Sequence, residues 1–238
     1  MAGCGWVLCM HGAGAANASP ASAARNGSHR PAKTTIPKQT ISIIQINLNK
    51  THAAHTELLR KINKLESYIA LITEPYCYKK KMCIMPKGCN YLPQIRGGHP
   101  RACIFSSKNL KIHEINELKT RDIALGLIKI EGKSTVIVSM YMDIKLDIES
   151  TLSPVLEYCQ KHGYGILLAA DTNAHHTDWG LETNERGKQI ETLIDSYGLT
   201  IHNRGRLPTY ECKLGSSIID VTMSVSYTHL TLPTIYSV

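Results

Sequence analysis

One stretch, residues 166–180, limits the possible folds of this chain more than any other. Ile166 to Ala170 is a short apolar run, which is typical of a buried strand, and Asp171 and Asn173 follow it directly. Open α/β sheets place their chemistry at the carboxyl ends of such strands. Residues two apart on an extended chain share a face, so this carboxylate and this amide could converge on a phosphate and an attacking water. An Asx-rich loop that merely caps a strand is the alternative.

Polar side chains also stand at the ends of other predicted strands. These strands cover residues 40–48, 69–73 and 134–141, and the polar residues are Asn47, Asn49, Glu74 and Tyr141. A further segment, residues 217–224, buries Asp220 among apolar neighbours, and a buried carboxylate is costly unless it is paired or bound. We therefore expect these side chains to meet at one sheet edge. Taken singly, each has a structural explanation: the amides could satisfy turns, the glutamate could cap a loop, and the tyrosine could be a core residue with a wet hydroxyl.

Helical patterns alternate with the predicted strands. The spacing of apolar residues predicts helices over residues 52–68, 147–162 and 186–197. Thr51 is expected to cap the first helix, Pro154 to break or begin the second, and Gly198 to end the third. Further strands are expected at residues 102–106 and 123–130, and residues 76–100 are expected to form a loop. The alternation predicts an α/β domain over residues 40–224.

Both ends of the chain differ in composition from this domain. Residues 1–39 are rich in Ala, Gly, Ser, Asn and Pro and show no apolar periodicity after Met10, which predicts a disordered or non-native leader. Residues 225–238 look like translated sequencing-adapter DNA, which predicts a non-native tail. We therefore expect one domain between two segments that do not belong to its fold.

Charge and metal-binding residue types limit the possible partners. The formal net charge of +8 is a mild indication of an anionic partner such as nucleic acid. Residues 79–81 and Arg96 could contact a phosphate backbone, although a solvated charge run is the alternative. The cysteines form no C-x-x-C pair, and no segment is long and apolar enough to span a membrane. The sequence therefore predicts a reduced intracellular protein whose oxygen donors suit Mg²⁺.

Short motifs in a fixed order resemble those of the endonuclease/exonuclease/phosphatase superfamily. They are Gln45-Ile46-Asn47-Leu48-Asn49-Lys50, Ile72-Thr73-Glu74-Pro75-Tyr76, Val138-Ser139-Met140-Tyr141, Ala170-Asp171-Thr172-Asn173-Ala174-His175-His176 with Trp179-Gly180, Arg186-Gly187, Asn203 with Pro208-Thr209-Tyr210, and Ser217-Ile218-Ile219-Asp220-Val221-Thr222. The likeness covers about residues 40–224. The chain most resembles the endonuclease domain at the front of a non-LTR (LINE-type) retrotransposon polyprotein.

The resemblance implies a fold and a reaction. The fold would be a four-layer α/β sandwich, in which two mixed β-sheets pack face to face with helices outside, here without its last strand. The reaction would be hydrolysis of phosphodiesters with Mg²⁺, Mn²⁺ being possible, which nicks target DNA and leaves a 3′-hydroxyl that primes reverse transcription. The implied partners are DNA and a downstream reverse transcriptase domain in the full polyprotein, without a membrane, and the implied place of action is the nucleus.

Roles for individual residues also follow from the resemblance. Glu74 would hold the metal with help from Asn47, and Asp171 would orient or deprotonate the attacking water. The remaining site residues would be Asn173 and Tyr141, which hydrogen-bond to the phosphate, and Asp220, which supports the site. DNA contacts are expected from Asn49, Lys50, Arg121 and His175. Because adjacent side chains point apart, His175 and His176 are expected to face DNA or to serve the structure rather than to share a metal.

The sequence departs from the family's pattern near its end. The family's domain closes with a strand and a Ser-Asp-His motif, which this sequence lacks, and His229 lies in the predicted tail and is not taken as a replacement. We expect an unpaired position at one sheet edge and a chain that is poorly active or inactive. Two other functions stay open: a cellular relative that acts on abasic DNA, RNA or a small phosphate ester, and a non-catalytic remnant that binds nucleic acid through residues 79–101.

Overall fold

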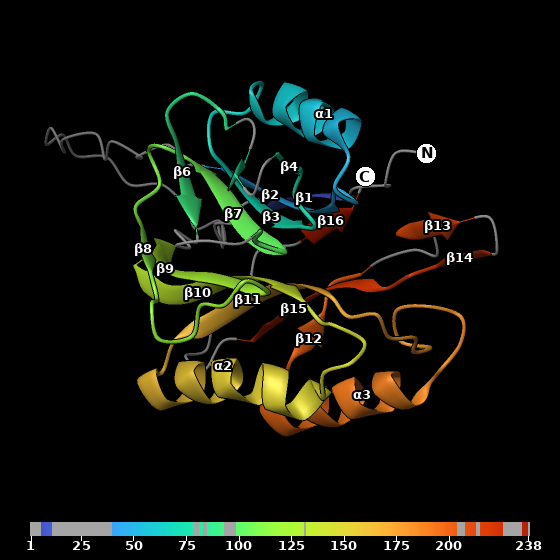
Figure 1. Cartoon of the computed structure of the whole chain (residues 1–238). Coiled ribbons are helices and arrows are strands. Elements are labelled where there is room, and N and C mark those ends of the chain that lie inside the picture. Colours follow the sequence, from blue (N-terminus) through green and yellow to red (C-terminus); the bar gives the residue numbers. More distant parts are fainter. Residues whose placement is uncertain are drawn as a thin grey trace, which may run out of the picture.

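Two six-stranded mixed sheets lie face to face, and helices cover their outer faces (Figure 1). Helix α1 (His52–Ile62) covers the first sheet, and helices α2 (Ile148–His162) and α3 (Glu185–Tyr197) cover the second. This is the four-layer α/β sandwich that the sequence predicts. The structure, a computed structural model, describes residues 6–10, 40–78, 81–82, 85–92, 99–130, 132–203, 208–212, 215–225 and 235–237.

The first sheet has the strand order β16-β1-β2-β3-β7-β6. Its strands are β1 (Trp6–Met10), β2 (Ile41–Asn47), β3 (Tyr68–Thr73), β6 (Cys89–Leu92), β7 (Ala102–Ser107) and β16 (Ile235–Ser237). Strands β2 and β3 are parallel because α1 connects them as a crossover, and the other neighbours are antiparallel. The carboxyl ends of β2 and β3 therefore lie at the same edge, with Asn47 opposite Thr73.

The second sheet has the order β12-β15-β11-β10-β9-β8. Its strands are β8 (Ile112–Glu114), β9 (Ile123–Ile130), β10 (Lys133–Tyr141), β11 (Gly165–Asp171), β12 (Thr200–Ile201) and β15 (Asp220–Val225). Strands β10 and β11 are parallel and joined through α2, and the other neighbours are antiparallel. Two small hairpins complete the described strands, β4 (Cys77–Tyr78) with β5 (Lys81–Met82) and β13 (Tyr210–Cys212) with β14 (Gly215–Ser217).

The core explains why the central strands are almost wholly apolar. Every residue of β3 and of β11 is buried, because one face of each strand meets the opposite sheet and the other face meets a helix. Between the sheets, Ile69 and Leu71 belong to the same hydrophobic cluster as Ile137 and Leu167. The strand predictions over residues 40–48, 69–73 and 134–141 rest on this pattern and match β2, β3 and β10.

Polar side chains also cross between the sheets. Gln45 Nε2 donates to the Ala170 carbonyl at 3.3 Å, and Ser139 Oγ donates to the Ile72 carbonyl at 2.9 Å. Both bonds are buried and lie close to the carboxyl ends of their strands. They fix how the two sheets sit against each other beside the predicted site.

The helices begin where the sequence predicts, but one of them ends early. Thr51 Oγ1 accepts from the Ala54 N–H at 3.3 Å, and Gly198 ends α3 in the left-handed conformation with φ of 64°. The prediction that α1 continues to residue 68 is wrong, because Tyr68 already begins β3 opposite Ser42. No helix among the described residues is long and apolar enough to cross a membrane.

Three other expectations differ from the structure. Pro154 lies inside α2 instead of breaking or beginning it, although it has no N–H to donate within the helix. Residues 217–224 are not one strand, because β14 ends at Ser217 and β15 begins at Asp220. Residues 76–100, expected to form a loop, contain β4, β5 and β6.

The outer edge of β2 is paired in the structure. Strand β1, from the predicted leader, lies antiparallel to β2, and β16, from the predicted tail, lies antiparallel to β1. The unpaired edge position that the sequence predicts is therefore not found next to β2. Residues 11–39 and 226–234, which make up most of the predicted leader and tail, lie outside the described residues, and so does His229.

Candidate active site

Three neighbouring strands bring predicted residues to one edge of the second sheet. Tyr141, the last residue of β10, lies opposite Asp171, the last residue of β11. Asp171 lies in turn opposite Asp220, the first residue of β15. Because β15 runs antiparallel to β11, its first residue reaches the edge at which β11 ends. The structure thus places these three residues side by side, and their catalytic roles remain predictions.

Asn47 connects this edge to the first sheet. Its Nδ2 donates to Asp171 Oδ2 at 2.8 Å, although the two residues are 124 positions apart. Its Oδ1 accepts from the Asn49 N–H at 2.7 Å, which fixes the orientation of the amide. The amide therefore holds the Asp171 carboxylate and still has a free lone pair on Oδ1 for a further ligand.

Four residues of this region have a left-handed backbone conformation. Asn49, Lys50, Glu74 and Asn173 have φ of 44°, 53°, 46° and 48°, and the described part of the chain has no other non-glycine residue with positive φ. Such conformations cost on the order of 1–3 kcal/mol each and persist where surrounding bonds enforce them. The Glu74 N–H donates to the Arg101 carbonyl, and the Glu74 carbonyl accepts from the Lys50 N–H, both at 2.8 Å.

The two aspartates of the edge are buried and electrostatically coupled. Asp171 is 1% exposed and Asp220 is 5% exposed. Burial raises the pKa of Asp171 to about 6, the hydrogen bond from Asn47 opposes this shift, and the charge of Glu74 adds to it. Burial and then the charge of Asp171 raise the pKa of Asp220 well above its ordinary value. Since the Oδ1 atoms of both aspartates have no hydrogen-bond partner among the described residues, a cation or a shared proton would be favourable here.

Tyr141 lies at the same edge, and a cation covers its ring. Burial, followed by the charges of Glu74 and Asp171, raises the pKa of Tyr141, so the phenol stays protonated at neutral pH and can donate a hydrogen bond. Arg101 Cζ lies 4.6 Å from the centre of its ring. Arg101 is itself held by Asp122 and, through Nη1 at 2.6 Å, by Asp143. Sequence reasoning missed Arg101, because only the fold brings it over Tyr141.

Asn173 reaches the edge by a turn and not by strand alternation. Strand β11 ends at Asp171 and Asn173 is left-handed, so the expected shared face of an extended chain does not apply to this pair. Asn173 Nδ2 donates to the carbonyl of Met142, the residue after Tyr141, at 3.0 Å. The Asn173 side chain thus lies next to the end of β10.

Asp220 is supported by residues whose motifs carried no predicted role. Asn203 Nδ2 donates to the Asp220 carbonyl at 2.8 Å, and Asn203 Oδ1 accepts from the Thr222 N–H at 2.9 Å. Thr209 Oγ1 accepts from the N–H groups of Ile219 and Asp220 at 3.0 and 3.1 Å. These bonds fix the start of β15. In the sequence, Asn203 and Thr209 belong to one of the motifs that resemble those of the superfamily.

The residues expected to contact DNA lie around this edge, and some of them already have partners within the protein. Lys50 Nζ lies 2.6 Å from Glu74 Oε1, where it pairs with the predicted metal ligand. The Arg121 side chain is 60% exposed and lies 3.6 Å from Asp122. His175 is partly buried, and its N–H donates to Asn184. Lys79, Lys80 and Arg96 lie outside the described residues, so their phosphate contacts remain predictions.

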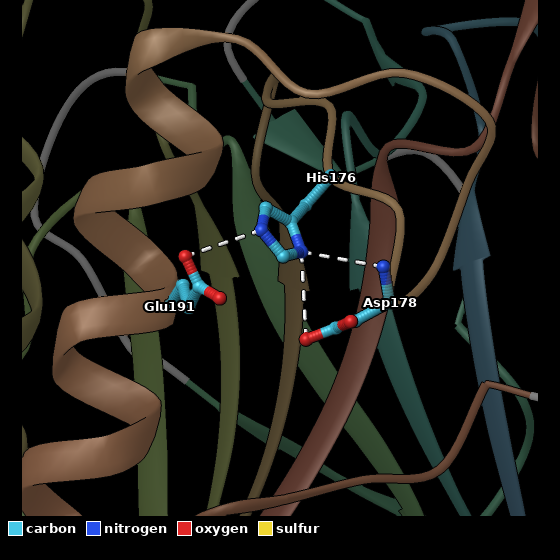
Figure 2. Close-up of side chains that lie close together, drawn as sticks. All are labelled: His176, Asp178 and Glu191. Carbon is cyan, nitrogen blue, oxygen red and sulfur yellow. Dashed lines mark hydrogen bonds and ion pairs between the residues drawn. The ribbon is translucent and has the colours of Figure 1, made fainter.

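A second polar cluster lies in the loop after β11 (Figure 2). His176 is 5% exposed; its Nδ1 accepts from the Asp178 N–H at 3.2 Å, and its Nε2 lies 3.3 Å from Glu191 Oε2 on α3. In the described chain, no other three His, Cys, Asp or Glu residues have ligand atoms all within 4.8 Å of one another. Because both ring nitrogens have partners, this cluster ties the loop to α3, which fits a structural role for His176.

The fold is similar to those of solved nuclease structures. The endonuclease domain of TRAS1, a telomere-specific non-LTR retrotransposon, matches with a TM-score of 0.66 and 28% identity over 76% of this chain and 83% of that chain. The Xenopus laevis APE2 catalytic domain matches with a TM-score of 0.55 and 13% identity over 76% and 81%. The AP endonuclease LMAP from Leishmania major matches with a TM-score of 0.53 and 10% identity over 78% and 79%. The last two likenesses concern the fold alone.

The sequence also matches a family model described as endonuclease-reverse transcriptase over residues 135–233. The matched segment contains Tyr141, Asp171 and Asp220, and therefore the whole edge of the second sheet described above. A comparison with curated proteins found no match.

Proposed function

Because this chain has the fold of the endonuclease/exonuclease/phosphatase superfamily, we propose that it hydrolyses phosphodiester bonds in DNA with a divalent metal ion. The reaction would take place at the strand-end cluster, which consists of Asn47, Glu74, Tyr141, Asp171, Asn173 and Asp220. The observation that carries the proposal is the meeting of Asn47, Asp171 and Asp220 across two sheets. The likeness to a retrotransposon endonuclease domain supports a nick in target DNA that primes reverse transcription. In that role the chain would act in the nucleus with a reverse transcriptase domain of the same polyprotein.

The residues present fit a hard metal ion. Glu74 and the free lone pair of Asn47 Oδ1 would hold Mg²⁺, or Mn²⁺ in its place. Asp171 Oδ1 and Asp220 Oδ1 are buried and have no hydrogen-bond partner among the described residues, so a bound cation would stabilise the negative charge of these carboxylates. When bound, the ion would neutralise charge on the phosphate oxygens as the transition state forms.

The protein side chains would divide the remaining work. Asp171, with a pKa of about 6, is largely ionised at neutral pH and can accept a proton from an attacking water. Asn47 holds that carboxylate in place. Tyr141 and Asn173 would donate hydrogen bonds to the phosphate. Burial and the charge of Asp171 raise the pKa of Asp220, which disfavours a second negative charge beside Asp171.

The test is nicking of supercoiled plasmid by the full chain with Mg²⁺. The chain contains no Ser-Asp-His motif and is therefore expected to nick slowly, so the assay uses protein in excess over plasmid. Asp171→Ala should lower the nicking rate by about 10²–10⁴-fold, which is the usual contribution of a general base. Asp195→Ala, which changes an exposed aspartate of α3, is the matched control. Equal rates for Asp171→Ala and the control would overturn the proposal.

A second substrate separates the open alternatives. The same proteins are given a duplex oligonucleotide with one abasic site and an otherwise identical undamaged duplex. Nicking of both duplexes supports an endonuclease for ordinary DNA. Nicking confined to the abasic duplex would instead support the cellular abasic-site alternative.

A further inference from the structure

Arg186 donates to a ring of backbone carbonyls beside the candidate active site. Its Nη1 lies 2.9 Å from the Leu146 oxygen and 3.4 Å from the Ile144 oxygen. Its Nη2 lies 3.3 Å from the Asp143 oxygen and 3.4 Å from the Thr172 oxygen. One guanidinium thus joins the loop after β10 to the loop after β11.

Helix stability does not explain an arginine at this position. Asn184 is the N-cap of α3, so Arg186 lies in the first turn, where the helix dipole disfavours a cation. Burial also lowers the pKa of Arg186, and only the charges of Asp143 and Asp147 oppose this shift. The carbonyl oxygens are therefore what keeps the guanidinium in place.

The two loops that Arg186 joins begin at predicted catalytic residues. Tyr141 ends β10 and Asp171 ends β11, and each loop leaves directly from these residues. Asn173 Nδ2 donates to Met142 O, one residue before the Asp143 carbonyl that Arg186 binds. The amide and the guanidinium are parallel links between the same two loops, and they extend the backbone bond from the Met142 N–H to the Asp171 carbonyl at 2.9 Å.

The start of α3 is held against the loop after β11, and this fixes the position of Arg186. Asn184 Oδ1 accepts from the N–H groups of His175 and Gly187 at 3.2 and 2.9 Å. A Cβ added to Gly187 would clash with the His175 carbonyl oxygen, so only a residue without a side chain fits here. The cluster of Figure 2 adds a third tie, between His176 and Glu191.

We propose that Arg186 is a positioning residue for phosphodiester hydrolysis: it sets the spacing between Tyr141 and Asn173 and does not touch the substrate. This inference rests on the proposed function, in which both side chains donate to the phosphate. It gives a role to both residues of the Arg186-Gly187 motif: the glycine allows the helix start to approach the His175 carbonyl, and the arginine binds the carbonyls of the two loops.

The first test separates the rate of nicking from the affinity for DNA. Arg186→Gln should lower the single-turnover nicking rate by about 10–100-fold, because displacements of about 1 Å in a catalytic group have effects of this size. The dissociation constant for DNA should stay within about twofold, since the guanidinium faces backbone carbonyls. Lys188→Gln, which removes an exposed cation from the same helix, is the control and should leave both quantities unchanged. An unchanged rate, or equal losses of rate and affinity, would overturn the inference.

Arg186→Lys keeps the charge but cannot reach all four carbonyls, so it should recover part of the lost rate. It also serves as the second variant if Arg186→Gln does not fold. A lysine variant as slow as the glutamine variant would contradict a role for the cation in setting this spacing.

A second measurement follows the Asn173 side chain directly. In the nuclear magnetic resonance spectrum of the full chain, the Asn173 amide protons should exchange with water faster in Arg186→Gln than in the wild type, and Lys188→Gln should match the wild type. Unchanged exchange would overturn the inference. A wild-type chain that does not nick DNA would overturn the proposed function together with this role, whereas active wild type with an equally active Arg186→Gln would overturn the role alone.

Discussion

Glu74 has a backbone conformation that a glutamate rarely adopts, and the structure shows what holds it there. Its φ of 46° is enforced by backbone bonds to Arg101 and Lys50 on either side. The strain directs the carboxylate toward the strand-end cluster, where its charge raises the pKa of Asp171 and of Asp220. The apolar run before Glu74 predicted its place at a strand end, but no pattern in the sequence predicted its conformation.

Lys50 should compete with a metal ion for Glu74. Its ammonium group lies 2.6 Å from the carboxylate, so a bound cation must displace it. Because the Lys50 side chain is 64% exposed, solvent screens the ion pair, and we expect Lys50→Met to tighten Mn²⁺ binding by only about two- to fivefold. Electron paramagnetic resonance of free Mn²⁺ measures the affinity, and Lys61→Met on α1 is the control. Weaker binding by Lys50→Met would contradict the competition.

Asp171 should destabilise the metal-free fold as it ionises. Its folded pKa of about 6 lies above the unfolded value of about 3.9. Its stabilising contribution is therefore fully present below about pH 4 and is lost as the pH rises through about 6. In EDTA, Asp171→Asn should gain stability over the wild type between about pH 4 and pH 8, by on the order of 2–3 kcal/mol.

Thermal denaturation at several pH values measures this gain. Asp195→Asn, which changes an exposed residue, should show no such trend. A difference between Asp171→Asn and the wild type that does not grow with pH would show that burial does not govern this carboxyl group.

At the scale of elements, short-range signals predicted most helices and strands. Thr51 and Gly198 act as the caps that their residue types favour, and the apolar runs became buried strands. The prediction for α1 ran past the end of the helix because Ile69, which belongs to β3, also fits the helical spacing of apolar residues. Strands β6 and β8 were missed because they are short edge strands without strong alternation.

The start of α3 should not tolerate a side chain at Gly187. A Cβ there would meet the His175 carbonyl at 1.9 Å, so the helix or the loop must move. We expect Gly187→Ala to lower the free energy of unfolding by about 1–3 kcal/mol despite the better helix propensity of alanine. Urea denaturation measures the change. Lys188→Ala, one residue along, should change stability by no more than about 0.5 kcal/mol, and an equal effect of the two variants would contradict this contact.

At the scale of the whole molecule, the site depends on contacts that no local pattern encodes. Asn47 and Asp171 come from different sheets and are joined by one hydrogen bond, and Arg101 reaches Tyr141 only through the packing of the two sheets. The sequence predicted the strand ends at which these residues lie, and the roles that the resemblance to the superfamily assigns to them stay predictions. It could not predict the cross-sheet bond or the carbonyls around Arg186, because these depend on how the sheets and loops pack.

The pairing of β1 with β2 predicts a role for the first residues of the chain. Deletion of residues 1–10 would uncover the outer edge of β2 and should increase aggregation, because an unpaired edge is a template for other strands. Light scattering during incubation at constant temperature measures this. Deletion of residues 1–5 alone, which leaves β1 intact, is the control. No difference between the two deletions would support the expectation from composition that residues 1–39 lie outside the fold.

The most direct test of the central claim is the end group of the nicked strand. Supercoiled plasmid is incubated with the full chain in Mg²⁺ or in EDTA. The plasmid is then purified from both incubations, and a DNA polymerase with labelled nucleotides and its own Mg²⁺ is added. If the strand-end cluster hydrolyses phosphodiesters and leaves a 3′-hydroxyl, label should enter the plasmid after incubation in Mg²⁺, and it should not after incubation in EDTA or with Asp171→Ala. Incorporation that is equal with Asp171→Ala, or equal in EDTA, would contradict the account.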